Sequence, residues 1–225
     1  MQINLNKSRK ASNEMIKMVR KNQCDLVVIS EPPNKFREIF SNFTIISPRT
    51  NLPRAIIIII NENIVSQFIP LRSKDLCAAK LSTSSWEFFL ISVYLPSDLS
   101  INEHLKKITG FLENNNGTPT IMSGDFNSHH SFWHGNDTKK GQKLLNWIRE
   151  LKLKVYSTPE PSFSRKNFLT SYIDLTLVNE QASELIDNFW QMKNRYSDHS
   201  AQIYTMKYFF LLFFLHNDKL IFFTD

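Results

Sequence analysis

The segment TIMSGDFN (120–127) begins with a strand-like stretch around Ile121 and Met122 and continues through Gly124 to Asp125 and Asn127. A short apolar run that stops at Gly and Asp predicts a buried β-strand leading into a loop. The same arrangement recurs in DLVVIS (25–30), which is followed directly by Glu31 and two prolines. Both segments therefore predict strands that present a carboxylate at the point where the strand ends.

Further strands are predicted wherever β-branched and aromatic residues dominate a short run. They lie at 1–6, 43–47, 55–60, 63–69, 76–81, 86–95, 172–178 and 200–206. Asn61-Glu62-Asn63 is typical of a tight hairpin turn between two of them. Helical spacing of apolar residues predicts helices over 8–22, over 140–151, and from Ser100, where Glu103 would complete a capping box. The pattern favours an α/β fold with two packed sheets and helices outside them.

The bulk composition limits the classes of protein and of partner. A chain of 225 residues with 42% hydrophobic residues fits one globular domain. The net charge of +6 favours a polyanionic partner, although a basic surface that serves only solubility would give the same value. Cys24 and Cys77 lie beside apolar runs and are expected to be buried free thiols, as in a reducing compartment.

No membrane partner is expected. The N-terminal residues lack the apolar core of a signal peptide. The apolar run YFFLLFFL (208–215) has eight residues, whereas a spanning helix needs about 20.

Acidic and polar residues at strand ends are the candidates for chemistry. Asp198 and His199 precede the last predicted strand, and Asp174 lies inside YIDLTLV (172–178), where a buried acid is costly unless paired or functional. Apart from Asp174, each of these residues alone has an ordinary explanation as a turn or cap residue. Together, oxygen ligands for a hard cation, a base and a proton donor are what phosphodiester cleavage requires.

The order of these motifs resembles the endonuclease/exonuclease/phosphatase superfamily over residues 1–207. The motifs are QIN (2–4), VVISEP (27–32), VYLP (93–96), SGDFN (123–127), YIDLTLV (172–178) and SDHS (197–200). The segments GDFNSHHSFWHG (124–135) and GQKLLNWI (141–148) further resemble the endonuclease domain of insect-type non-LTR retrotransposons. This resemblance implies a four-layer α/β/β/α sandwich of two mixed β-sheets flanked by helices. The tail at 208–225 fits nothing in the family.

The resemblance also implies roles for single residues. Glu31, Asn4 and Asp198 would hold Mg²⁺, with Mn²⁺ as an alternative. The catalytic residues would be Asp125, Asn127, Asp174, His199 and Tyr94. Asp174 would orient His199, and whether Asp125 or His199 takes the proton of the attacking water stays open.

The implied activity is metal-dependent nicking of duplex DNA, which leaves a 3′-hydroxyl and a 5′-phosphate. A reverse transcriptase domain in the full-length element and a nuclear location would follow. An abasic-site endonuclease or phosphatase of the same superfamily, or an inactive DNA-binding remnant, are the alternatives.

Several weaker features lie near these motifs. The histidines at 129, 130 and 134 are expected to form a polar rim loop more readily than a zinc site, and Phe132 and Trp133 to pack rather than stack on bases. The basic and hydroxyl residues that could approach DNA are Arg49, Arg54, Lys139, Lys140, Lys143, Ser162, Ser164, Arg165 and Lys166.

Overall fold

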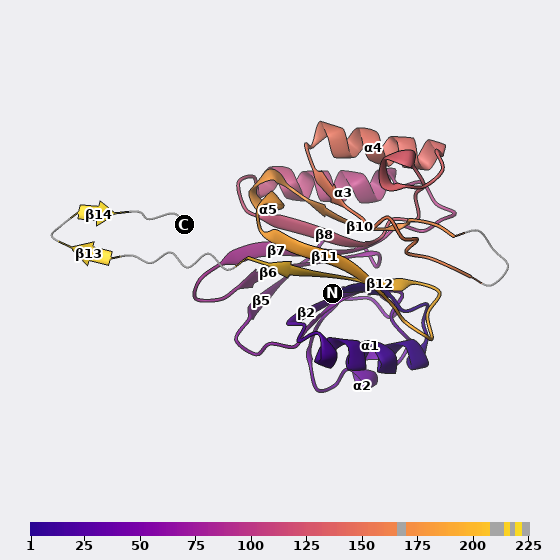
Figure 1. Ribbon diagram of the computed structural model, residues 1–225, viewed down its shortest axis with the longest axis horizontal. Coiled ribbons are helices and arrows are strands. Elements are labelled where there is room, and N and C mark those ends of the chain that lie inside the picture. The colour runs from indigo at the N-terminus through magenta and orange to yellow at the C-terminus, as the bar shows by residue number, and fades with distance from the viewer. Residues whose placement is uncertain (166–169, 208–213, 217–218, 222–225) are drawn as a thin grey trace.

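The computed structural model describes residues 1–165, 170–207, 214–216 and 219–221. Two six-stranded mixed sheets lie face to face, and the longer helices cover their outer faces, α1 below and α3 and α4 above in Figure 1. The predicted four-layer α/β/β/α sandwich is therefore confirmed. Lys166 and most of the tail at 208–225 lie outside the described residues.

Each sheet combines strands from distant parts of the chain. The first sheet has the order β11 (Ile186–Lys193), β12 (Ser200–Met206), β1 (Gln2–Asn4), β2 (Leu26–Ser30), β4 (Ala55–Ile59), β3 (Thr44–Ile46). The second has the order β5 (Val65–Ile69), β6 (Leu76–Ser82), β7 (Glu87–Tyr94), β8 (Thr120–Asp125), β10 (Asp174–Val178), β9 (Lys154–Tyr156). A separate pair is formed by β13 (Phe214–His216) and β14 (Lys219–Ile221).

The helices are attached to the sheets by apolar faces. They are α1 (Arg9–Lys21), α2 (Phe36–Ile39), α3 (Asn102–Asn114), α4 (Lys139–Glu150), α5 (Glu180–Ser183) and a 3₁₀ turn at Ser131–Trp133. α1 and α2 pack with the first sheet in one apolar cluster, and α3 and α4 pack with the second sheet in another. A third cluster fills the space between the two sheets. Among the described residues, no helix is long and apolar enough to cross a membrane.

Local sequence explains where α1 begins and which face it buries. The hydroxyl oxygen of Ser8 accepts a hydrogen bond from the N–H of Ala11 at 3.1 Å, which caps the first turn. Met15 and Val19, one turn apart, are both buried against the first sheet. The helix prediction over 8–22 is confirmed.

Two local predictions are wrong. The segment Asn61-Glu62-Asn63 makes no hairpin, because β4 belongs to the first sheet and β5 to the second. Ser100 does not cap α3, since Ile101 occupies the N-cap position with its side chain buried, and the hydroxyl of Ser100 instead accepts from the N–H of Asn102. Burial of an apolar side chain has displaced the expected polar cap.

The cysteine prediction is half right. Both thiols are free, and Cys77 is buried as expected, whereas Cys24 is only partly buried. Burial raises the pKa of both thiols.

Strand direction brings the candidate residues to one end of the sandwich. In the first sheet β1 and β2 run parallel and β12 runs antiparallel to β1, so the ends of β1 and β2 meet the start of β12. In the second sheet β7 and β8 run parallel and β10 runs antiparallel to β8, so the same convergence occurs there. The two sets face each other and form a single rim.

Candidate active site

Glu31 is held at the rim by its backbone. It follows β2 directly and adopts a left-handed conformation, with φ of 46°. Its N–H donates to the carbonyl oxygen of Arg54 at 2.8 Å, and its own carbonyl oxygen accepts from the N–H of Lys7 at 2.9 Å. A left-handed residue with a long side chain is strained, so these bonds fix the direction in which the carboxylate leaves the strand.

Asn4 joins the two sheets at the rim. Its Nδ2 donates to Asp125 Oδ2 at 2.9 Å and lies 3.3 Å from Glu31 Oε2. Its Oδ1 accepts from the N–H of Asn6 at 2.8 Å. The amide nitrogen therefore faces both carboxylates, and the amide oxygen is already engaged on the other side.

Gly124 places Asp125 against the neighbouring strand. A Cβ at this position would collide with the carbonyl group of Val93, so only glycine allows this approach of β8 to β7. Asp125 then lies in register with Tyr94 on one side and Asp174 on the other. Its side chain is 2% exposed, although it carries a potential charge.

His199 lies between Asp125 and Asp174. Its Nδ1 is 2.8 Å from Asp174 Oδ2, and its Nε2 is 4.0 Å from Asp125 Oδ2. The ring of Phe163 packs against the imidazole edge to face, with centroids 5.0 Å apart. The imidazole is thereby fixed with Nδ1 toward Asp174 and Nε2 toward the rim.

Burial and neighbouring charges separate the pKa values of these groups. Burial and the nearby Asp174 carboxylate raise the pKa of Asp125 to about 7. Burial alone would lower the pKa of His199, but the carboxylates of Asp174, Asp125 and Asp198 together outweigh it and raise that pKa to about 9. Near neutral pH, His199 is therefore an imidazolium and Asp125 is poised to exchange a proton.

Asn127 and Tyr94 flank Asp125. The N–H of Asn127 donates to Asp125 Oδ1 at 2.9 Å, and Asn127 adopts a left-handed backbone with φ of 43°. Burial and the carboxylates of Glu31 and Asp125 raise the pKa of Tyr94, so its phenol stays protonated. Both residues can offer hydrogen-bond donors to an oxygen placed at the rim.

Asp198 lies on the outer side of the same rim. Asn6 donates to both of its carboxylate oxygens, at 3.2 and 3.3 Å, and Arg165 Nε lies 3.8 Å from Oδ2. The hydroxyl of Ser197 donates to the carbonyl oxygen of Asn4 at 2.8 Å, which ties the Asp198 loop to β1. The eight residues predicted for the site thus share one end of the sandwich.

The chemistry of the rim fits a hard divalent cation. Carboxylates outnumber the cationic partners Lys7, Arg165 and His199. Glu31 keeps a partly open carboxylate, with 17% of its side chain exposed, and Mg²⁺ typically takes one or two carboxylates and completes its shell with water. Within the described ranges, no group of three or more His, Cys, Asp or Glu side chains could enclose a metal ion. Glu31 and Asp198, with 17% and 15% of their side chains exposed, are the carboxylates of the rim that are open to such a cation.

Other predicted residues have structural roles. His130 caps the 3₁₀ turn through a bond from the N–H of Phe132, and the His129/His130/His134 segment forms no metal cluster in the described structure. Trp133 is fully buried, as predicted for a packing residue, whereas Phe132 is 56% exposed, so its predicted packing role is wrong.

The basic residues divide into free and engaged groups. Arg54 is not available to reach DNA as predicted, because it forms a bidentate ion pair with Asp75 and stacks over Tyr94. Lys140 donates to the carbonyl oxygen of Pro96. Arg49, Lys139, Lys143, Ser164 and Arg165 are exposed.

The sequence profile of a family described as "Endonuclease-reverse transcriptase" matches residues 88–203, more than half of the chain. The chain belongs to this endonuclease-reverse transcriptase family. Its profile covers β7, β8, β10 and the SDHS segment, which carry five of the eight predicted site residues. No curated protein matches the chain.

Solved structures share the fold of this family member. The endonuclease domain of TRAS1, described as a telomere-specific non-LTR retrotransposon, superposes with a TM-score of 0.84 at 21% identity, covering 92% of this chain and 96% of that one. An AP endonuclease, LMAP from Leishmania major, gives 0.67 at 12% identity, covering 92% and 86%. TDP2 from D. rerio, complexed with a single-strand DNA product, gives 0.63 at 11% identity, covering 91% and 96%.

Some residues of the site were not predicted from the sequence. Lys7 reaches Glu31 at 3.7 Å and Asn6 holds Asp198, but both follow β1 in a segment without any pattern of its own. Phe163 contacts His199 from a loop that is distant in sequence. Gln2, whose Nε2 donates to Asp174 Oδ1 at 2.9 Å, was also missed. Its position two residues before Asn4, and therefore on the same face of the strand, could have indicated it.

Proposed function

We propose that this endonuclease-reverse transcriptase family member is a divalent-metal-dependent endonuclease that nicks duplex DNA and leaves a 3′-hydroxyl and a 5′-phosphate. The observation that carries the proposal is the pairing of Asp125, whose pKa is raised to about 7, with a His199 imidazolium 4.0 Å away. Hydrolysis of a phosphodiester is accelerated by a base for the attacking water and by a cation for the charge that develops on the phosphate.

Asp125 is the proposed general base. Its carboxylate accepts a proton from water, and Asn4 and Asn127 hold its two oxygens in place. His199 is already an imidazolium, which leaves Nε2 free to donate to a non-bridging phosphate oxygen, while Asp174 balances its charge. Asn127 and Tyr94 supply further donors. A divalent cation at Glu31 would supply Lewis-acid stabilisation of the charge that develops on the phosphate.

Duplex DNA is the proposed substrate. A cavity of about 380 Å³ opens beside Glu31, and Lys7 and Lys74 in its lining place positive charge next to the carboxylate rim, whereas the charge of Arg54 there is balanced by Asp75. Basic residues near a cleavage site attract the phosphate backbone. The resemblance to non-LTR retrotransposon endonucleases supports a reverse transcriptase domain as partner and the nucleus as the place of action.

The proposal is tested by relaxation of supercoiled plasmid. The wild-type chain is expected to nick with Mg²⁺ and to stop when a chelator is added. Glu31→Gln and His199→Ala are expected to lower the rate by about 10²–10⁴-fold, whereas Glu38→Gln, an exposed carboxylate of α2, leaves it unchanged. A DNA ligase seals the product only if it carries a 3′-hydroxyl and a 5′-phosphate.

The alternatives give different results with the same protein. Intact duplex, an abasic-site oligonucleotide and a phosphoinositide are offered separately. Faster cleavage of the abasic strand than of intact duplex, by tenfold or more, would assign the chain to repair-type chemistry. Folded protein that retains DNA but cleaves none of the three substrates would be an inactive remnant.

A further inference from the structure

Two glutamines of the first sheet reach across to Asp174 in the second sheet. Gln2 of β1 donates from Nε2 to Asp174 Oδ1 at 2.9 Å, and Gln202 of β12 donates from Nε2 to the backbone oxygen of Asp174 at 2.7 Å. The two glutamines are register partners in the β1–β12 pair, and both are fully buried. They approach the same residue from neighbouring strands.

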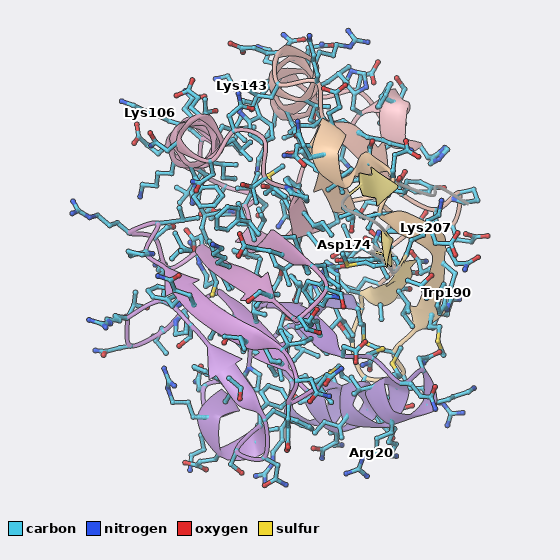
Figure 2. The ribbon with its side chains drawn as sticks, turned by 90° about the vertical axis from the view of Figure 1, so that its left-hand side faces the viewer. Arg20, Lys106, Lys143, Asp174, Trp190 and Lys207 are labelled. Atoms are coloured by element: carbon cyan, nitrogen blue, oxygen red, sulfur yellow. The ribbon has the colours of Figure 1, made fainter. Side chains whose placement is uncertain are left out.

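Together with two other contacts, they occupy every polar group of Asp174. Its Oδ2 faces His199 Nδ1, and its N–H donates to the hydroxyl oxygen of Ser162 at 3.0 Å. Rotation of the carboxylate would break the bonds to Gln2 and His199 at once. Figure 2 shows Asp174 inside the molecule, away from surface residues such as Lys106 and Lys143.

Each glutamine forms its side-chain hydrogen bond through the amide nitrogen and not through the amide oxygen. Neither Gln2 Oε1 nor Gln202 Oε1 has a hydrogen-bond partner among the described residues, although both atoms are buried. An unpaired buried oxygen destabilises the fold. The reversed amide orientation would place the oxygen of Gln2 against a carboxylate, which is less favourable still. The contribution of each glutamine therefore comes from its N–H groups.

We propose that Gln2 and Gln202 are positioning residues for phosphodiester cleavage: Gln2 holds the carboxylate of Asp174 and Gln202 holds its backbone, and together they keep Asp174 in the orientation that fixes His199. The expected effect on the cleavage rate rests on the proposed function. The contacts of Asp174 with Gln2 and His199 are present without substrate. Thr176 provides the comparison for a purely structural role. Its hydroxyl is 2.6 Å from that of Ser123 in the same buried layer, so its removal also costs a buried polar contact.

The first test compares two buried substitutions of similar size. Gln2→Met keeps the length of the side chain and removes its N–H groups, and Thr176→Val removes a buried hydroxyl that does not touch Asp174. Gln2→Met is expected to lower kcat for plasmid nicking by about 10–100-fold with little change in KM, as for partners of a functional histidine. Thr176→Val is expected to keep kcat within about twofold of wild type at a comparable loss of Tm. Equal effects of both variants on kcat would overturn the proposal.

A double-mutant cycle separates positioning from general destabilisation. If Gln2 acts through Asp174, Gln2→Met in an Asp174→Ala background lowers kcat no further. An equal loss in both backgrounds would mean that Gln2 acts elsewhere. Should Gln2→Met fail to fold, Gln202→Met serves in the same cycle, with a smaller expected loss because it releases the backbone of Asp174 and not its carboxylate.

A measurement without substrate distinguishes this inference from the proposed function. The low-field NMR signal of the His199 Nδ1 proton is expected in the wild-type chain, and it should shift or broaden in Gln2→Met but not in Thr176→Val. If the NMR signals follow this pattern but the wild-type protein never nicks DNA, the proposed function is refuted and the positioning of Asp174 by Gln2 is retained. An unaltered signal in Gln2→Met would refute the positioning of Asp174 by Gln2, whatever the nicking assay gives.

Discussion

Replacing Asp174 with Asn should change how stability depends on pH. Against the opposing effect of burial, the carboxylates of Asp174, Asp125 and Asp198 raise the pKa of His199 from its ordinary value of 6.5 to about 9, and Asp174 contributes most. At 1.36 kcal/mol for each pKa unit, this difference corresponds to about 3 kcal/mol of stabilisation. A folded-state pKa above the unfolded value stabilises the protein fully below pH 6.5, and that stabilisation is lost as pH rises through 9.

The assay is urea denaturation of wild type and Asp174→Asn between pH 6 and pH 10. The gap in unfolding free energy between the two proteins should shrink by about 3 kcal/mol over this range, because only the wild type loses a proton from the His199–Asp174 pair. Taking the difference removes contributions that both proteins share. The contribution of Asp125 is not shared, because the Asp174 carboxylate also raises its pKa, and deprotonation of Asp125 near pH 7 in the wild type shrinks the gap further. Asp187→Asn, an exposed carboxylate of β11, should show no such trend. A constant gap, or a wild-type His199 that titrates near pH 6.5, would refute the reasoning.

Three other substitutions follow from the fold and the site. Asp75→Asn leaves Arg54 without its carboxylate partner and should lower the unfolding free energy by about 2–3 kcal/mol in urea; an unchanged midpoint would contradict a structural role for the pair. Gly124→Ala should abolish nicking and lower Tm, because a Cβ collides with Val93; normal activity would show that β7 and β8 can separate. Trp133→Ala should cost about 3–5 kcal/mol by calorimetry, and a cost below about 1 kcal/mol would mean that it is not a core residue.

Apolar runs identified most of the sandwich because central strands bury both faces. The segments that became β2, β4 and β8 are nearly all buried, and β2 and β4 are continuous apolar runs, whereas β8 combines Ile121 and Met122 with small or polar residues. β11 was not predicted, since it lies at the edge of its sheet and its residues IDNFWQMK are mostly exposed or half-buried. Edge strands have only part of one face in the core, so their sequences lack a clear period.

Connections between elements were the least predictable part. The Asn61-Glu62-Asn63 segment has the composition of a hairpin turn, but it carries the chain from one sheet to the other. Turn composition reports local backbone freedom, whereas the choice of sheet depends on which apolar face each strand buries. The Ser100 cap failed for a related reason, because burial of Ile101 outweighed a polar contact.

The site was predicted as a set of residues and, among its contacts, only the pairing of Asp174 with His199 was predicted. Strand direction explains why Glu31, Asp125 and His199 share a rim, and motif order was enough to indicate it. Sequence could not indicate that Asn4 faces two carboxylates with its nitrogen, or that Arg54 is committed to Asp75. These choices depend on side-chain rotation in a packed environment, which has no period along the chain.

If the proposed function holds, cleavage should be lost on heating before the secondary structure melts. Asn4, Glu31 and His199 are attached to one sheet, and Asp125, Asp174 and Tyr94 to the other, so neither sheet carries a complete set of reacting groups. A slide of one layer over the other by an ångström or two would leave every strand hydrogen-bonded and still separate the groups that must act on a single phosphate. The nicking rate should therefore depend on how the two sheets are aligned with each other.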